Sequence, residues 1–280
     1  MKQSAETIER IKLLRQQGFT LGEIITETNI PKSTAFYHIK NLAKSNYLKG
    51  RLLAINRAKQ KTLTDGRRGK SVKPYSYRVP LEWNAAFVGL VAHFMFDGEI
   101  SRVSSIYNNR SRTLVNNVIS LMDTVLGVSD YKLLRKPDGV LRVSYHHVEI
   151  AAFLRQKVRE LLSYIRGGSY EEKTAFLKAF YDDEGNVTFT PRKRIVRGYQ
   201  HSLEILQLVK ELLADLGIAS RMEARFYELC ISRRADLLRF RDVINFSDGV
   251  CINGLRSNSV WKESLEKKEI LERLINSYRC

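Results

Sequence analysis

The chain has 280 residues, of which 44% are hydrophobic and 28% charged, so it has the balance of a globular protein with a substantial core. No apolar run approaches the roughly 20 residues that a membrane-spanning helix needs, and the first residues lack the apolar core of a signal peptide. The formal net charge of +17 favours a polyanionic partner, most commonly nucleic acid, with basicity for solubility alone as the alternative.

The cysteines bear on the compartment. Cys230, Cys251 and Cys280 are widely spaced, with no CxxC pair and no histidine at zinc-ligand spacing. This pattern predicts free thiols in a reducing environment. We therefore expect a cytoplasmic protein with no membrane partner, associated with the nucleoid or, in a eukaryote, with an organelle.

Residues 1–45 show three short helical patterns separated by tight turns. Apolar residues recur on one face of the first two, and after the break at Pro31 we expect Ser33 to cap the third. Two short helices with a tight turn between them form a helix-turn-helix. The stretch resembles the helix-turn-helix of resolvases, invertases and small repressors, which implies an all-α DNA-binding domain.

The third helix of this domain would enter the major groove. Its basic and hydroxyl side chains suit phosphate and base-edge contacts. A packing or dimerisation module is the alternative. The residues that we expect to contact DNA are Lys32, Ser33, Thr34, Tyr37, His38 and Lys40.

Residues 46–80 are strongly basic. Between Lys49 and Arg78 there are ten basic residues and one acid, and residues 46–80 contain Gly66, Gly69, Pro74 and Pro80. We interpret it as a basic linker with a helical turn or two near its start. Arg67 and Arg68 within it are expected to contact DNA.

The remainder of the chain contains an internal repeat. Gly98 and Gly185, each preceded by an acid at the end of an apolar helical pattern, lie 87 residues apart. The pairs Gly127 with Gly217 and Phe153 with Phe240 keep nearly the same spacing. A duplicated unit of about 85 residues explains these offsets. We place the repeats at 81–168 and 169–258, followed by a C-terminal helix over 259–280.

The two apolar helical patterns carry a recognisable motif. Leu90–Gly98 and Leu177–Gly185 resemble two copies of the LAGLIDADG motif of homing endonucleases, and the resemblance extends over residues 81–247. It implies an α+β fold, a pseudo-twofold duplicated αββαββα arrangement with saddle-shaped antiparallel sheets over the DNA. Small residues, Gly89 and Ala92 in one copy, would let the two motif helices approach closely.

The last acid of each motif is the candidate catalytic residue. Asp97 and Glu184 would end side by side, and with the backbone of Gly98 and Gly185 they would hold Mg²⁺ or another divalent cation. Such a site can activate water and cut one bond in each strand. The basic residue that assists the metal is not assignable from sequence. Candidates are Lys132, Arg192, Lys193 and Arg225.

These residues predict a site-specific endonuclease that binds a long pseudo-palindromic site in double-stranded DNA as a monomer. His93 and Met95 depart from the family pattern, so the first motif is degenerate, and both acids could merely end their helices. The alternative is a non-catalytic, sequence-specific transcription regulator with the same surfaces. An intron RNA maturase is a third interpretation.

The strands after each motif supply the expected recognition surface. Strand residues of alternate parity would face the major groove, where Arg and Gln read base edges, although a solvated face is the alternative for any single residue. In the first repeat these residues are Arg102, Ser104, Tyr107 and Asn109. In the second they are Arg192, Lys193, Arg194, Arg197, Tyr199 and Gln200.

Overall fold

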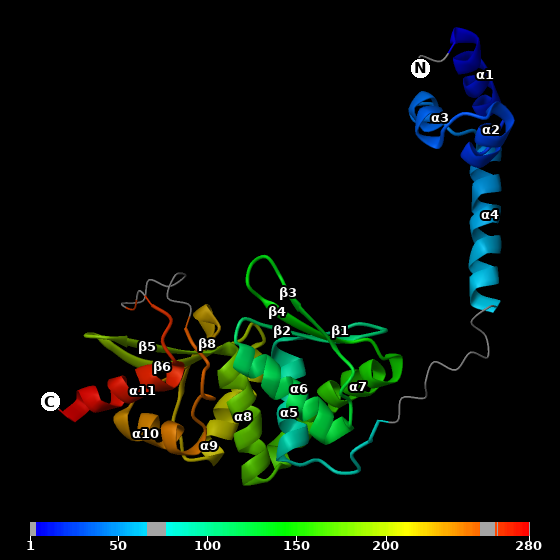
Figure 1. Ribbon diagram of the computed structural model, residues 1–280. Helices are drawn as coiled ribbons and strands as arrows, with labels where there is room; N and C mark the ends of the chain where they lie inside the picture. Colours follow the sequence, from blue (N-terminus) through cyan, green and yellow to red (C-terminus); the bar gives the residue numbers. More distant parts are fainter. Residues whose placement is uncertain (1–3, 66–76, 253–260, 262, 280) are drawn as a thin grey trace. The chain divides into compact units, whose positions relative to one another are not determined.

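A computed structural model describes residues 4–65, 77–252, 261 and 263–279 (Figure 1). The chain divides into two compact units, Met1–Tyr75 and Ser76–Cys280. Within the described residues, no helix has the length and apolar character required to cross a membrane.

The first unit is entirely helical. Thr20 and Glu23 form a capping box at the start of its second helix, and Asn29 ends that helix in the left-handed conformation. Ile11, Ile24 and other apolar side chains from the first three helices form its core. The helices are α1 (Ala5–Gln16), α2 (Leu21–Thr28), α3 (Lys32–Ile39) and α4 (Asn46–Asp65).

Two expectations for this unit were wrong. Ser33 does not cap α3, because the helix begins one residue earlier and its N-cap, Pro31, has no side-chain hydrogen bond. The segment expected to be a linker instead begins with the 20-residue helix α4. The start of α4 is anchored, since Leu48 is fully buried and Arg51 pairs with Glu23 at 2.6 Å. Tertiary contacts therefore outweigh the weak helical period of this stretch.

The second unit consists of two copies of one αββαββα arrangement followed by a helix. The first copy contains α5 (Ala85–Phe96), β1 (Gly98–Ile100), β2 (Ser105–Asn109), α6 (Arg112–Leu126), β3 (Lys132–Arg135), β4 (Leu141–Tyr145) and α7 (Val148–Tyr164). The second contains α8 (Tyr170–Glu184), β5 (Gly185–Thr190), β6 (Lys193–Tyr199), α9 (Leu203–Asp215), β7 (Arg221–Glu223), β8 (Glu228–Ile231) and α10 (Arg234–Val243). The helix α11 (Lys267–Asn276) ends the unit, and 3₁₀ turns occupy Ile165–Gly167, Ala224–Phe226 and Ser277–Arg279. The α+β fold class predicted from the sequence is confirmed.

Each copy has a four-stranded antiparallel sheet of the same topology. The strand orders are β1-β2-β4-β3 and β5-β6-β8-β7. The register places Gly98 opposite Tyr107 in the first sheet and Gly185 opposite Gly198 in the second. Tyr107 and Gly198 therefore occupy equivalent positions, which becomes important at the site.

The helices α5 and α8 pack side by side at the centre of this unit, and both sheets lie on the same side of the helices (Figure 1). Phe96 of α5 packs against Phe176 and Phe180 of α8, and other apolar side chains of the two helices, such as Leu90, Val91 and Leu177, are fully buried in the core. Burial of such side chains contributes about 1.5–3 kcal/mol each to folding. This contact fixes the positions of the two helix ends.

A glycine directly follows the acid at the end of each of these two helices, and the backbone geometry requires it. A Cβ on Gly98 would lie 2.2 Å from the carbonyl oxygen of Phe94, and one on Gly185 would lie 2.2 Å from that of Tyr181. Gly89 differs, because a Cβ there would meet nothing within 4 Å. The expectation that Gly89 is needed for close helix approach was therefore wrong.

Two element boundaries are not visible in the sequence pattern. A 3₁₀ turn over Ala224–Phe226 and the left-handed Tyr227 precede β8. The C-terminal helix begins at Lys267 rather than near residue 259. Backbone conformation at a single residue decides the first of these boundaries, and hydrophobic periodicity does not report it.

Replacing Gly98 by alanine should lower the free energy of unfolding by about 2–4 kcal/mol, because the new methyl group would collide with backbone that cannot move aside. Gly89→Ala, in the same helix, is the matched control and should raise stability by about 0.5–1 kcal/mol. Urea unfolding followed by circular dichroism measures both. Equal effects of the two substitutions would contradict the steric argument.

Candidate metal and DNA-binding site

The two motif acids lie at the ends of the central helices. Asp97 is the C-cap of α5 and Glu184 is the last residue of α8. Since the helices pack side by side, the two carboxylates and the neighbouring Asp183 act on one another electrostatically. The structure thus brings together the two acids that the sequence pointed to.

Crowding and burial disfavour ionisation of both acids. Burial and the charge of Asp183 raise the pKa of Asp97 to about 7. Burial, followed by the charges of Asp97 and Asp183, raises the pKa of Glu184 to about 7. A divalent cation bound at these carboxylates would offset the charge that burial and crowding disfavour, so the electrostatics favour a cation site.

The donor chemistry fits a metal whose shell is completed by substrate. Among the described residues, no cluster of three or more His, Cys, Asp and Glu side chains is arranged to hold a metal ion. Mg²⁺ in phosphate-processing sites takes one or two carboxylates and fills the remaining positions with water and substrate oxygens. Two carboxylates at the helix ends match that requirement.

A buried pair crosses the helix interface beside the acids. His93 of α5 and Asp183 of α8 lie 2.9 Å apart, Nδ1 to Oδ2, and both side chains are almost completely buried. Burial alone lowers the pKa of His93, but the charge of Asp183 and the hydrogen bond to it outweigh burial and raise it. Sequence reasoning took His93 as a sign of motif degeneration. The partner of His93 is Asp183, the residue directly before Glu184 in the second motif. This additional acid was the feature of the sequence that could have indicated the pair.

Two residues expected to contact DNA instead belong to this buried network. Tyr107 is fully buried and its hydroxyl donates to Asp183 Oδ1 at 2.5 Å. Asn109 donates from Nδ2 to Asp97 Oδ2 at 2.7 Å. Tyr107 as a DNA contact is therefore a correction, since its side chain faces the helices, and Asn109 is engaged with an acid of the site.

The basic residue beside the acids is Lys267, which sequence reasoning missed. It begins α11, is 7% exposed, and donates from Nζ to the carbonyl oxygen of Asp182 at 2.9 Å. Its charge lowers the pKa of both Asp97 and Glu184, while burial lowers its own pKa. Only the tertiary fold brings this residue, far along the chain, to the motif.

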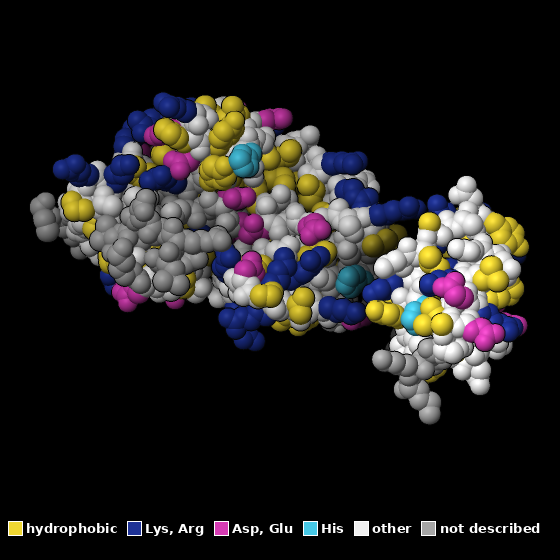
Figure 2. Space-filling model, turned by 90° about the horizontal axis from the view of Figure 1, so that it is seen from above, with side chains coloured by type: hydrophobic (Ala, Val, Ile, Leu, Met, Phe, Trp, Pro, Cys, Tyr) yellow, Lys and Arg dark blue, Asp and Glu magenta, His cyan; other side chains and the backbone are white. Residues whose placement is uncertain are grey.

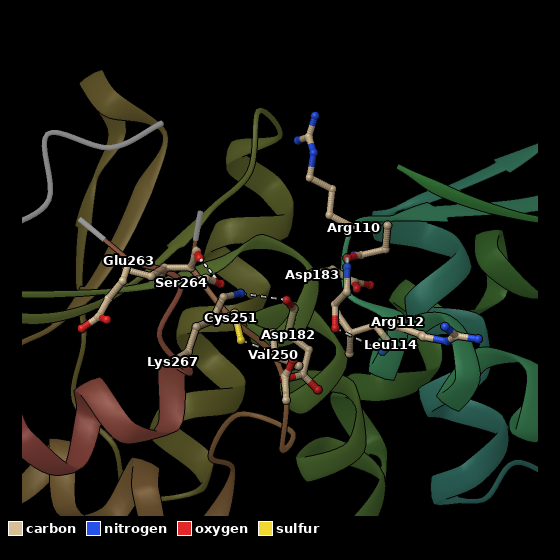
Figure 3. A pocket seen from close by; sticks show the side chains of 14 residues that line it. Arg110, Arg112, Leu114, Asp182, Asp183, Val250, Cys251, Glu263, Ser264 and Lys267 are labelled. Carbon is tan, nitrogen blue, oxygen red and sulfur yellow. Dashed lines mark hydrogen bonds between the residues drawn. The ribbon is translucent and has the colours of Figure 1, made fainter. Parts of the chain in front are cut away.

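A pocket of about 640 Å³ opens beside this cluster. Figure 3 shows Asp182, Asp183 and Lys267 along it, with Arg110, between β2 and α6, and Arg112, the first residue of α6, on another side. Acidic and basic groups therefore border one cavity, an arrangement suited to a metal together with a phosphate group.

In the second sheet, the alternation along β6 sorts the predicted recognition residues. Val196 and Gly198 are buried towards the helices, so Lys193, Arg197 and Tyr199 point to the opposite, open face. Lys193 and Tyr199 are exposed, while both oxygens of Glu228 accept hydrogen bonds from Arg197 at 3.2 Å. Arg192 is exposed in the β5–β6 turn, and Gln200 follows β6 with its backbone bonded to Tyr227.

Arg194 was wrongly placed in the recognition set. Arg194 lies on the same face of β6 as the buried residues Val196 and Gly198, and its Nε donates to Ser277 Oγ at 2.7 Å. Its guanidinium also lies over the ring of Tyr278 at 5.1 Å. Arg194 therefore ties β6 to the C-terminal 3₁₀ turn.

Ser104, in the first repeat, was also wrongly placed, since it is buried and its backbone N–H donates to Ser101 Oγ at 3.1 Å. Arg102 in the same turn is exposed, as predicted for a DNA contact. Viewed from above, the larger unit shows several acidic side chains near its middle, with Lys and Arg side chains among and around them (Figure 2). This distribution suits a phosphate backbone that crosses an acidic metal site.

In the first unit, the predicted contact residues lie on the outer side of α3. Ala35 and Ile39 are buried in the core, whereas Lys32, Ser33, Tyr37 and Lys40 are exposed and Thr34 and His38 half-buried. Lys40 Nζ lies 4.7 Å from the ring centre of Tyr37. Phe36, 54% exposed, extends this surface and was missed because it reads as apolar. Arg67 and Arg68 lie outside the described residues.

The fold and the paired helix ends define a class of protein, a duplicated αββαββα unit with two acids at its pseudo-twofold centre. The family model of the LAGLIDADG-like domain matches residues 171–245, so the second repeat carries a LAGLIDADG-like domain.

Solved structures with related folds include mesophilic variants of the homing endonuclease I-DmoI, 19% identical, covering 59% of this chain and 91% of that one with a TM-score of 0.46. I-DmoI in complex with DNA and Mn is 16% identical, covering 57% and 97% of the two chains with a TM-score of 0.45. Full-length DUF199/WhiA from Thermatoga maritima is 14% identical, covering 72% and 64% with a TM-score of 0.48.

Among curated proteins, a DNA gyrase subunit from Mycolicibacterium flavescens is 24% identical over 156 residues, which are 51% of this chain. The chain spans 28% of the length of that relative.

The raised pKa values predict a pH-dependent stability. The folded protein disfavours ionised Asp97, so the stability present at pH 5 is lost as the pH rises through about 7. Relative to wild type, Asp97→Asn should therefore gain on the order of 1 kcal/mol between pH 5 and pH 8 in metal-free protein. Thermal unfolding at both pH values measures this gain.

Asp248→Asn is the matched control, because Asp248 pairs with Lys268 and its pKa is lowered, so it stays ionised across this range. The control should show no gain between the two pH values. A pH-independent difference between Asp97→Asn and wild type would refute the electrostatic account.

Proposed function

We propose that this protein is a metal-dependent, site-specific DNA endonuclease of the LAGLIDADG type. The observation that carries the proposal is the pair of acids, Asp97 and Glu184, held at adjacent helix ends with both pKa values raised to about 7. Purely structural helix-ending acids would be better placed in solvent, where ionisation is not penalised.

In this proposal Asp97 and Glu184 hold Mg²⁺ or another divalent cation, with the backbone of Gly98 and Gly185 leaving room for the DNA. When bound there, the cation would supply an activated water and would neutralise charge that develops on the cleaved phosphate. Lys267 offsets the negative charge of the acids from beneath and favours their ionised form. In this proposal each acid acts on one of the two DNA strands, and the α5–α8 packing, which holds the two helix ends next to one another, supports it.

The open faces of the two sheets supply the proposed DNA surface. Arg102 and the open-face residues Lys193 and Tyr199 contact phosphates and base edges, and the second unit binds as a monomer because both half-sites are in one chain. The first unit grips adjacent DNA through the outer side of α3 as a helix-turn-helix. The net charge of +17 suits a long duplex site.

A second candidate function is a DNA-binding regulator that does not cut. The observation that favours it is the limited number of protein donors, since the described residues offer no group of three metal-binding side chains. Both candidates share the DNA surface, and only the chemistry separates them.

Cleavage of a randomised plasmid library with Mg²⁺ or Mn²⁺ tests the proposal. Asp97→Asn and Glu184→Gln should each lower double-strand cleavage by at least about 10²-fold, because each removes a metal ligand. Asp215→Asn, which changes an exposed acid paired with Lys173 at the far end of α9, should cut normally. Tight specific binding without cutting in any divalent ion would instead establish the regulator.

The role of α3 predicts a specific loss of DNA affinity. Lys40→Ala should reduce the slope of log K against log[salt] by about 1 and weaken binding of the full-length chain to its site. Lys12→Ala removes the same charge from α1, where Lys12 pairs with Glu9, and should leave the slope nearly unchanged. Fluorescence anisotropy at several salt concentrations measures both, and equal slopes for the two variants would argue against contact through α3.

A further inference from the structure

Among the residues that the structure describes, a chain of hydrogen bonds runs from the helix interface to Asp97 and not to Glu184. His93 bonds Asp183, and the Tyr107 hydroxyl donates to the other oxygen of Asp183. Asn109 Nδ2 lies 3.3 Å from the Tyr107 hydroxyl and donates to Asp97 at 2.7 Å. The chain therefore connects a buried ion pair to the carboxylate of Asp97.

The side chain of Asn109 is fixed from both ends. While its Nδ2 bonds Tyr107 and Asp97, its Oδ1 accepts from the backbone N–H of Ser111, the N-cap of α6, at 2.9 Å. An amide held at both its oxygen and its nitrogen has one orientation. The Asp97 carboxylate that it touches is correspondingly restricted.

The second repeat has the apolar counterpart of this chain. The repeat offset places Phe180 at the position of His93 and Phe96 at that of Asp183, and these rings pack edge to face with centres 5.1 Å apart. Gly198 stands at the position of Tyr107, and a Cβ there would lie 2.2 Å from the Phe180 ring. No hydroxyl can therefore reach towards Glu184 from that position.

The two acids consequently differ in their surroundings. Within the described part of the chain, no hydrogen bond to the Glu184 carboxylate is found, whereas Asp97 has one from a fixed amide. Helix packing does not require the His93–Asp183 pair, because the aromatic pair Phe96–Phe180 fills the equivalent place in the second repeat. Apolar pairs often stabilise a core as well as buried ion pairs do.

We propose that the His93–Asp183–Tyr107–Asn109 chain is a positioning device that orients the Asp97 carboxylate. The two acids then bind divalent cation with unequal affinity, and the two DNA strands are cut at unequal rates. This inference rests on the proposed nuclease function for its kinetic part, but the difference in metal affinity can be measured without cutting. Preorganised ligands bind more tightly because less motion is lost on binding.

The test removes one atom from the chain. Tyr107→Phe keeps the ring and deletes the hydroxyl that links Asp183 to Asn109. Tyr164→Phe is the matched control, because the Tyr164 hydroxyl also donates to a carboxylate. Its acceptor is Glu172, at 2.7 Å, which is not one of the two motif acids. Asn109→Ala deletes the last link itself.

Metal affinity is measured by titrating Mn²⁺ into the full-length protein bound to its DNA site and counting free Mn²⁺ by electron paramagnetic resonance. Wild type should show two classes of site, and Tyr107→Phe and Asn109→Ala should each weaken the tighter class by about tenfold. Tyr164→Phe should match wild type. A single class of site in wild type, or weakening of both classes together, would overturn the inference.

Strand cleavage is measured in parallel on duplexes labelled at either strand. Wild type should cut one strand about tenfold faster or more, and Tyr107→Phe should slow that strand alone. The double variant Tyr107→Phe/Asn109→Ala should be no slower than Asn109→Ala, because both act through one path. Equal rates on the two strands of wild type overturn the inference and leave the nuclease proposal standing. Unequal Mn²⁺ sites without any cutting would support the inference on Asp97 and overturn the nuclease proposal.

Discussion

The packing of α5 against α8 decides where both acids lie. Each helix buries an apolar face against the other, and each ends in an acid followed by a glycine whose missing side chain lets the strand leave at once. Because the helices run side by side, their ends must meet. The acids are thereby held in a partly buried position that neither repeat could create alone. Burial first, and then the charge of neighbouring carboxylates such as Asp183, raises their pKa values.

The duplication gives the unit its symmetry, and substitutions within the interface have broken it. One crossing contact is aromatic, Phe96 against Phe180, and its counterpart is the buried pair of His93 and Asp183. The same backbone therefore accommodates both chemistries. A polar pair in a low-dielectric interior is held in one geometry by its hydrogen bonds, whereas an aromatic pair contributes mainly area. The polar version extends to one acid, and this makes the two halves of the candidate site chemically different.

Much of the fold was predictable because its determinants are local. Apolar periodicity located the motif helices, the repeat offset identified the duplication, and the acid before each glycine marked the candidate ligands. The errors arose where a residue's role depends on a distant partner. Tyr107 faces the helices and bonds Asp183, Arg194 is held by the C-terminal turn, and α4 is anchored through Arg51 to Glu23. From residue type alone, Tyr107 and Arg194 were expected to be exposed DNA contacts, and the segment that contains α4 was expected to be a linker.

The sequence by itself determined the α+β class, the two repeats and the pair of acids, since these depend on spacing and on residue type along a continuous segment. Only the tertiary structure decided which basic residue lies beneath the acids and which acid is hydrogen-bonded. Lys267 lies 83 residues after Glu184 in the sequence, yet its ammonium group bonds the end of α8. Strand register and helix packing select such contacts, because a side chain's partners depend on which face it occupies and not on its neighbours in the chain.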